Sequence, residues 1–224
     1  MGYHDLYVPQ YKLRNIVTGG AGLIGSHLID KLIKDKEEVI CIDNFITGNL
    51  KNIKKHIPNP NFKLIKHDVL DELPNITAER IWHMACPASP LKYQLNPVET
   101  SKICFIGTYN MLEFALKNKS KFLFASSSEI YGNPKEHPQS EDYEGSLNTT
   151  SIRACYDEGK RLAETLCFDF KRAYNLDIRI ARIFNTYGPR MAENDGRVIS
   201  NFIVQALRGD EITIYGDGSQ TRSF

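Results

Sequence analysis

Residues 13–25, LRNIVTGGAGLIG, decide the fold, because an apolar run passes directly into a glycine-rich turn and then into a helical pattern. In such a unit Gly19 permits the tight turn, Gly22 lets the backbone approach a pyrophosphate, and Gly25 lets the helix pack closely on the strand. The phosphates would meet free N–H groups and the positive end of the helix dipole. A glycine-rich turn can also serve only to bend the chain, but the strand and helix patterns on its two sides favour a dinucleotide site.

A second apolar run, EVICID at 38–43, ends in Asp43, at the distance where an acid receives the ribose hydroxyls of a dinucleotide. A carboxylate there would repel a 2′-phosphate, and no arginine immediately follows it. The sequence therefore predicts NAD rather than NADP as the cofactor. Asp68 and Val69, just after a third run, would then lie near the adenine, although a helix cap or a turn explains Asp68 equally well.

Short apolar runs alternate with helical patterns along most of the chain, which predicts an α/β fold with a Rossmann-like, doubly wound parallel sheet covered on both faces. Longer helices are expected at 96–118 and 156–174, the second with apolar residues at intervals of four. The six runs expected to form strands are 13–18, 38–43, 62–65, 80–85, 121–126 and 178–183.

After Ile183 the alternation loosens into a turn-rich stretch, a predicted helix at 198–208, a predicted strand at 212–215 and a glycine-rich end. We therefore assign residues 1–183 to an NAD-binding Rossmann domain. Residues 184–224 are expected to be the start of a small C-terminal substrate lobe that is apparently truncated.

Composition and charge narrow the classes of partner. The 28 basic and 27 acidic residues leave a net charge of +1, which gives no long-range attraction to nucleic acid or to an anionic membrane. No apolar run has the length of a signal peptide or of a membrane span. The five cysteines contain no C-x-x-C pair, so we expect reduced thiols, no metal site and a cytoplasmic location.

Tyr156 and Lys160 are four residues apart at the start of a predicted helix and share one of its faces. A free tyrosine titrates near ~10, but an adjacent ammonium and a nicotinamide cation would favour the phenolate and make it a usable base. Such a pair alone is a common coincidence on amphipathic helices. The fifth apolar run, however, ends in Ser127, Ser128 and Glu129, at the sheet edge where open α/β folds bind ligands.

Together these segments resemble the extended short-chain dehydrogenase/reductase family that acts on nucleotide sugars, over residues 14–224. The motifs that carry the resemblance are TGGAGLIGSHL (18–28), DNFITGN (43–49), HDV (67–69), PASP (87–90), SSSEIYG (126–132), YDEGK (156–160) and RIFNTYGPR (182–190). Within the family, the similarity is greatest to the UDP-glucuronate decarboxylase (UDP-xylose synthase) subgroup. The segments typical of that subgroup are HPQSEDY (137–143), RACYDEGKR (153–161) and NDGRVISNF (194–202).

Two alternatives remain beside a decarboxylase. In the sister dTDP-glucose 4,6-dehydratases an Asp-Glu pair usually stands where this chain has Ser128 and Glu129, so the acid that would expel water is missing. The family's epimerases usually lack the glutamate. The third reading is a truncated NAD-binding protein without turnover, because the family's chains continue by roughly another third beyond the position of Phe224. That part includes an arginine that pairs with the sugar carboxylate.

The resemblance implies a closed hydride cycle with tightly bound NAD. Tyr156 takes a proton from the C4 hydroxyl of UDP-glucuronate while hydride passes to NAD, the 4-ketone loses its carboxylate as CO₂, and return of the hydride gives UDP-xylose. In this scheme Ser127 binds O4, Glu129 acts as an acid–base or water-orienting group, and Lys160 holds the ribose and lowers the pKa of the tyrosine.

The resemblance also implies further contacts and a homodimer formed through the helices at 96–118 and 156–174. Where the family often has asparagine, Cys104 loses a hydrogen-bonding side chain. A turn would also explain Asn185, and solvated surface charges would explain Lys102 and Arg197. The additional residues expected to contact the cofactor are Leu23, Ile24, Asn44, Thr47, Gly48, Met84, Cys86, Ala125, Thr186 and Arg197. Those expected to contact the UDP-sugar, besides Tyr156, are Lys102, Asn110, Asn185 and Arg222.

Overall fold

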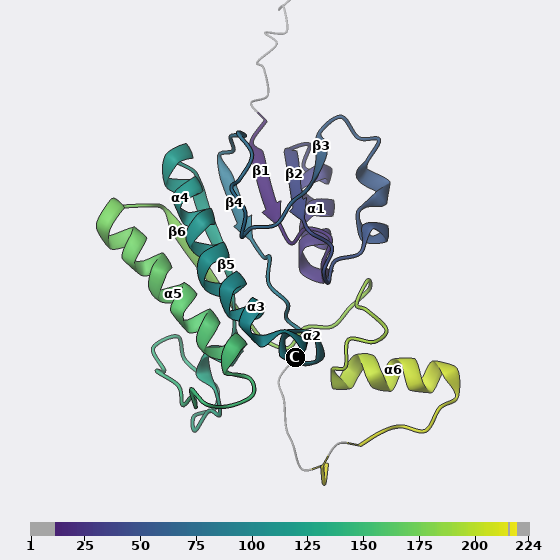
Figure 1. Cartoon of the computed structure of the whole chain (residues 1–224). Coiled ribbons are helices and arrows are strands. Elements are labelled where there is room, and N and C mark those ends of the chain that lie inside the picture. The colour runs from purple at the N-terminus through teal and green to yellow at the C-terminus, as the bar shows by residue number, and fades with distance from the viewer. Residues whose placement is uncertain (1–11, 215, 219–224) are drawn as a thin grey trace, which may run out of the picture.

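The computed structural model describes residues 12–214 and 216–218. Its centre is a six-stranded parallel sheet with the order β3-β2-β1-β4-β5-β6, and Figure 1 shows the helices arranged around it. Each strand lies on one of the six apolar runs, so the predicted Rossmann-like fold is confirmed. The strands are β1 (Arg14–Thr18), β2 (Glu38–Asp43), β3 (Phe62–Lys66), β4 (Arg80–His83), β5 (Lys121–Ser127) and β6 (Ile178–Ile183).

The two long predicted helices are present with one difference. The stretch expected to be a single helix at 96–118 consists of α3, a five-residue π-helical segment η3, and α4 in direct succession. None of the helices in the described ranges is long and apolar enough to span a membrane. The helical elements are α1 (Leu23–Lys34), η1 (Leu50–Asn52), η2 (Lys54–His56), α2 (Pro90–Leu95), α3 (Pro97–Lys102), η3 (Ile103–Gly107), α4 (Thr108–Asn118), η4 (Ser128–Tyr131), α5 (Ala154–Tyr174) and α6 (Val198–Arg208).

The sheet has a separate apolar core on each face, because successive side chains of a strand point to opposite sides. In β1, for example, Ile16 belongs to one core and Val17 to the other. The core beneath α4 and α5 includes Ile16, Ile42, Met111, Leu112, Cys167 and Phe170. The core beneath α1 includes Val17, Val39, Cys41, Ile29, Leu32 and Ile53.

His83 is a buried polar residue that joins three elements at the carboxyl edge of the sheet. Its Nδ1 lies 2.8 Å from the hydroxyl of Thr18 on β1, and its Nε2 lies 3.2 Å from the hydroxyl of Thr108 on α4. Burial and the charge of Lys160 lower the pKa of His83 to about 3. The imidazole is therefore neutral at physiological pH and acts as a structural bridge.

The segment after β6 is fastened to the Rossmann core at its beginning and exposed farther on. Arg190 forms an ion pair with Asp30 on α1, and the ring of His27 lies 3.0 Å from the carbonyl oxygen of Pro189. Although burial would raise it, hydrogen bonds from Arg190, His56 and Lys55 hold the pKa of Asp30 well below its ordinary value. The segment is thus anchored to the outer side of α1.

The predicted helix at 198–208 is confirmed as α6, whereas the predicted strand at 212–215 is wrong over its described part. Residues 212–214 are not in a strand, and Ile212 and Ile214 are exposed. A strand needs a neighbour to pair with its backbone, and no described strand pairs with this segment. The apolar alternation alone therefore did not suffice to form one.

Candidate active site

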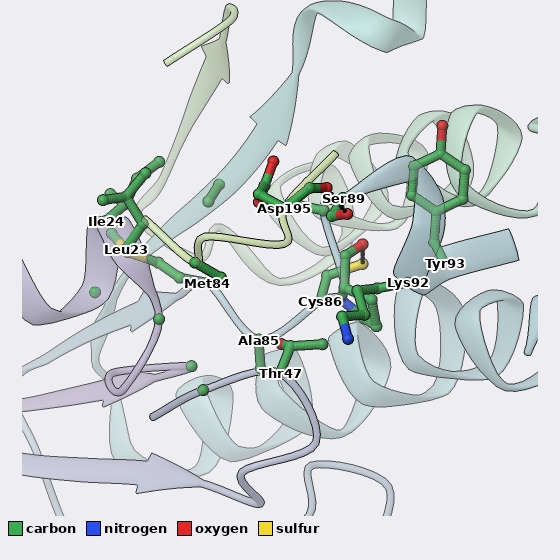
Figure 2. A pocket seen from close by; sticks show the side chains of 18 of the residues that line it. Leu23, Ile24, Thr47, Met84, Ala85, Cys86, Ser89, Lys92, Tyr93 and Asp195 are labelled. Atoms are coloured by element: carbon green, nitrogen blue, oxygen red, sulfur yellow. Dashed lines mark hydrogen bonds between the residues drawn. The ribbon is translucent and has the colours of Figure 1, made fainter. Parts of the chain in front are cut away.

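A cavity of about 810 Å³ runs along the carboxyl ends of the central strands (Figure 2). This is the edge at which open α/β sheets bind ligands. The predicted residues that line it are Gly19, Gly22, Leu23, Ile24, Gly25, Asp43, Asn44, Thr47, Gly48, Asp68, Val69, Met84, Cys86, Ala125, Ser127, Glu129, Tyr156, Lys160, Asn185, Thr186 and Arg197.

The glycine turn leaves no room for side chains at two positions. Gly19 has φ +65°, and a Cβ there would lie 2.8 Å from the carbonyl oxygen of Met84. A Cβ on Gly25 would lie 2.4 Å from the carbonyl oxygen of Gly19, which is backbone and cannot move aside. Gly22 caps α1 without a side-chain hydrogen bond, so the first N–H groups of the helix remain available to an anion. The turn therefore has the features that a dinucleotide pyrophosphate requires.

Asp43 lies at the end of β2 and has a structural role that the sequence did not reveal. Its carboxylate accepts hydrogen bonds of 2.8 Å from the backbone N–H groups of Ala21 and Phe45. Burial raises the pKa of Asp43, while these two hydrogen bonds act in the opposite direction. Because Ala21 belongs to the glycine turn, the acid that faces the pocket also holds the turn in place.

Asp68 combines the two roles that the sequence left open, since it closes a turn and also lines the cavity. Its carboxylate accepts a hydrogen bond of 2.9 Å from the N–H of Leu70 and one of 2.7 Å from the side-chain amide of Asn44. Asn110, by contrast, does not line the cavity and donates its amide to the carbonyl oxygens of Val69 and Leu70, at 2.9 and 3.3 Å. Its observed role is to support the pocket wall.

The opposite end of the cavity contains the paired tyrosine and lysine of α5, both buried. The ammonium of Lys160 donates a hydrogen bond of 2.8 Å to the carbonyl oxygen of Ala125 on β5. It also lies 4.7 Å from the ring centroid of Phe124. The ring of Tyr156 stacks on that of Tyr93, with centroids 4.8 Å apart and planes 7° from parallel. Both functional groups are thus held rigidly by packing.

Burial raises the pKa of Tyr156 well above its ordinary value, and negative charge at Cys86 raises it further. A side-chain hydrogen bond with Ser127 acts in the opposite direction. We expected Lys160 to lower this pKa. Among the protein's own groups, burial outweighs any such effect, because the phenolate loses its hydration in the interior.

Glu129 lies beside the tyrosine and forms an ion pair with Arg153, one residue before α5. Its backbone N–H donates a hydrogen bond of 3.2 Å to the hydroxyl of Ser127, which caps η4. Arg153 also lies 3.7 Å from the carboxylate of Asp157, whose pKa burial raises to about 6. Arg153 lines the cavity and was not among the predicted site residues, although the motif RACYDEGKR contains it.

Two predicted residues do not line the cavity, and a third lies outside the described residues. Lys102 is half exposed, pairs with Glu99 at 3.6 Å and does not line the cavity. Asn110 supports the wall from behind, and Arg222 lies outside the described residues. Arg197 does line the cavity, but its guanidinium pairs with Asp195 rather than standing as a solvated charge.

Comparison with known proteins identifies the family of the chain. The model of the NAD dependent epimerase/dehydratase family matches residues 15–224. UDP-glucuronic acid decarboxylase 4 of Arabidopsis thaliana is 54% identical over 95% of this chain and 48% of its own length. UDP-glucuronic acid decarboxylase 1 of Xenopus tropicalis is 53% identical over 94% of this chain and 50% of its own length. The chain therefore spans about half the length of these relatives.

Solved structures agree with the fold. UDP-glucose 4-epimerase of Thermotoga maritima, determined with UDP-glucose, superposes with a TM-score of 0.83 and 32% identity over 94% of this chain and 68% of its own. dTDP-glucose 4,6-dehydratase of Streptomyces venezuelae, determined with NAD, gives a TM-score of 0.82 and 26% identity over 94% and 67%. The sequence resemblance is thereby confirmed. This chain belongs to the NAD dependent epimerase/dehydratase family, and its cofactor is NAD.

Proposed function

We propose that the protein to which this chain belongs converts UDP-glucuronate to UDP-xylose and CO₂. The observation that carries the proposal is the position of Tyr156, Ser127 and Glu129 at one end of the NAD cavity. Relatives at 53–56% identity named UDP-glucuronic acid decarboxylase point to the same substrate. A hydroxyl, a phenol and a carboxylate at that end suit chemistry on a sugar ring.

Bound NAD would supply a tightly held hydride store for C4 of the sugar. Tyr156 takes the proton of the C4 hydroxyl, and Ser127 hydrogen-bonds both the phenol and the sugar oxygen. Oxidation at C4 turns the C6 carboxylate into that of a β-keto acid, which loses CO₂ because the electrons delocalise into the ketone. Lys160 is held by Ala125 beside the tyrosine, where its positive charge favours the phenolate and opposes the effect of burial.

Glu129 would deliver the proton that enters at C5 after CO₂ has left, either directly or through a water molecule that it orients. Its ion pair with Arg153 fixes the position of the carboxylate beside Tyr156. Ser128 occupies the position at which the sister dehydratases usually have an aspartic acid, so the group that would protonate a leaving hydroxyl is missing. Decarboxylation is therefore favoured over loss of water.

We also propose a homodimer formed through α4 and α5. Figure 1 shows these helices side by side, on the side of the molecule away from α1. Five apolar side chains of α4, α5 and the adjoining η3 are each 40–45% exposed, namely Phe105, Ile106, Tyr109, Leu162 and Phe168. Light scattering should give twice the chain mass, and Phe168→Glu should give a monomer. A monomeric parent chain at micromolar concentration would contradict this arrangement.

The activity is tested with two purified proteins, this chain and a chimera that continues it with the C-terminal part of an Arabidopsis relative. Each is incubated with UDP-glucuronate or dTDP-glucose, and CO₂ and the sugar products are measured. The proposal predicts CO₂ and UDP-xylose from the chimera. A 4-keto-6-deoxy sugar would instead identify a dehydratase. Activity of the chimera without activity of this chain would show that the C-terminal part supplied by the relative is required.

Tyr156→Phe provides the matched variant in the chimera, because it removes only the phenolic oxygen. Turnover should fall by ~10³-fold or more, in line with the loss of a general base and of its hydrogen bonds. NAD binding should be retained, since the ring still stacks on Tyr93. Turnover within tenfold of the parent would rule out Tyr156 as the base.

A further inference from the structure

Two cysteines from different elements meet at the wall of the NAD cavity. Cys86 lies between β4 and α2 and lines the cavity (Figure 2), and Cys104 lies behind it on η3. Their Sγ atoms are 3.3 Å apart. A disulfide bond is about 2.0 Å long, so the two sulfurs need to approach by only ~1.3 Å to be joined.

The two thiols differ in access and in acidity, as a reactive cysteine and its resolving partner do. Cys86 is partly exposed to the cavity, whereas Cys104 is only 2% exposed. The contact with Cys104, helped by the charge of Lys160, lowers the pKa of Cys86 to about 7 despite burial. The same contact, together with burial, raises the pKa of Cys104 well above its ordinary value. An oxidant in the cavity would therefore meet a thiolate first at Cys86.

The surroundings restrict the other directions that these thiols could take. A Cβ on Gly159 would lie 2.8 Å from Cβ and 3.0 Å from Sγ of Cys104, so helix α5 passes directly beside that cysteine. The thiol of Cys155, the remaining cysteine of the neighbourhood, is directed to the carbonyl oxygen of Tyr93 at 3.7 Å. Cys104 is thus confined next to Cys86.

We propose that Cys86 and Cys104 form a redox-convertible dithiol that peroxides oxidise to a disulfide at the wall of the cofactor pocket. The Cys86 thiolate attacks a peroxide oxygen, the O–O bond breaks, and sulfenic acid and hydroxide form. The sulfur of Cys104 then attacks the sulfur of Cys86, its proton leaves with the hydroxyl as water, and the S–S bond forms. The two sulfurs lose two electrons, and hydrogen peroxide, with one proton from solvent, becomes two waters.

The disulfide would tie the wall segment between β4 and α2 to η3. Because Cys86 lines the cavity that holds the dinucleotide, bound NAD should cover it. We therefore expect saturating NAD to slow oxidation of Cys86 severalfold. This expectation concerns only the cofactor end and does not depend on the sugar substrate.

Peptide mapping tests the proposal directly, because trypsin places the five cysteines in five different peptides. The purified chain is treated with a few equivalents of hydrogen peroxide, free thiols are alkylated under denaturing conditions, and the tryptic peptides are analysed by mass spectrometry. The proposal predicts a linked pair of peptides 81–92 and 103–117, two hydrogens lighter than their sum. The peptides of Cys41 and Cys167, both buried, should stay fully alkylated and serve as internal controls.

Two variants complete the test. In Cys104→Ser the link cannot form, and Cys86 should remain as a sulfenic acid that dimedone traps. In Cys155→Ser the 86–104 link should form at the parent's rate. Linkage of Cys86 to Cys155, oxidation of Cys86 to sulfinic acid in the parent without a link, or resistance to peroxide at tenfold excess would each overturn the proposal. Peptide mapping of the parent chain still tests the proposal if the Cys104→Ser variant fails to fold.

Discussion

Strands β1 and β6 belong to the same sheet, yet their surroundings differ. Every residue of β1 after Arg14 is buried, whereas only Ile178 of β6 is. β1 has a strand on each side and cores on both faces, while β6 is the edge strand and leads into the exposed segment after Ile183. The dinucleotide end of the cavity is thus built within a complete core. The opposite end, where we propose that the sugar binds, borders on residues that are partly exposed.

The polar groups at the two ends differ in the same way. At the dinucleotide end Asp43 is buried and bonded to two backbone N–H groups. In α6, at the other end, Ser200 is the only buried residue, and the side chain of Leu207 is 83% exposed. Substitutions at the dinucleotide end should therefore reduce stability or NAD binding strongly, whereas substitutions in α6 should have little effect.

The largest effect is expected at Gly25, where a methyl group would collide with the backbone of the glycine turn. Gly25→Ala should weaken NAD binding by more than 100-fold, measured by calorimetry, because the turn must open and its N–H groups lose their alignment. Gly188→Ala is the matched control, since a Cβ there meets nothing within 4 Å. Binding within threefold of the parent would show that the turn is not rigid.

The next effect concerns a buried charge on α5. Burial raises the pKa of Asp157 from 3.8 to about 6, so the folded state holds this proton more tightly than the unfolded state. The protonated carboxyl group of Asp157 therefore contributes to the stability of the fold below pH ~4. This contribution is lost as the pH rises through ~6. Asp157→Asn should therefore raise the free energy of unfolding by about 2 kcal/mol at pH 7.5 and leave it unchanged near pH 4.

Urea unfolding at both pH values checks this expectation. Asp169→Asn is the control, because that carboxylate is exposed on the same helix. If the Asp157 variant tracked the parent at both pH values, Arg153 would have to compensate the burial fully.

A smaller effect is expected for cofactor choice. Asp43→Asn should reduce the preference for NAD over NADP by about tenfold, or ~1.4 kcal/mol, because the repulsion of a 2′-phosphate disappears. The amide oxygen can still accept one of the two backbone N–H groups, so the fold should persist. Binding of both dinucleotides is measured, with Asp35→Asn at the far end of α1 as control. An unchanged ratio would assign the discrimination to other groups.

The smallest effect is expected in α6. Leu207→Ser should change the free energy of unfolding by less than ~0.5 kcal/mol, since its side chain already faces solvent. The same change at Leu32, which is buried in the core beneath α1, should cost ~2 kcal/mol or more. Equal effects at the two leucines would abolish the contrast between the two regions.

The sequence predicted best what depends on neighbours along the chain. The six strands and α6 follow from local apolar patterns, and the glycine turn with Asp43 is a local motif. The strand predicted at 212–215 is absent over residues 212–214, because pairing needs a partner that the sequence pattern cannot supply. The Arg153–Glu129 pair joins residues 24 positions apart, and the contact of Asn110 with the wall at Val69 spans 41. Such contacts become visible only when the chain has folded.

The ion pair between Arg190 and Asp30 joins helix α1 to the segment that follows β6. The N-terminal end of helix α1 lines the cavity, while His27 and Asp30 on the same helix contact the segment that follows β6. A sugar that fixed the segment after β6 in position would increase the affinity for NAD through α1. Thermodynamic reciprocity then requires bound NAD to strengthen sugar binding by the same factor. This partly buried ion pair would then determine how strongly binding in one half of the cavity affects binding in the other.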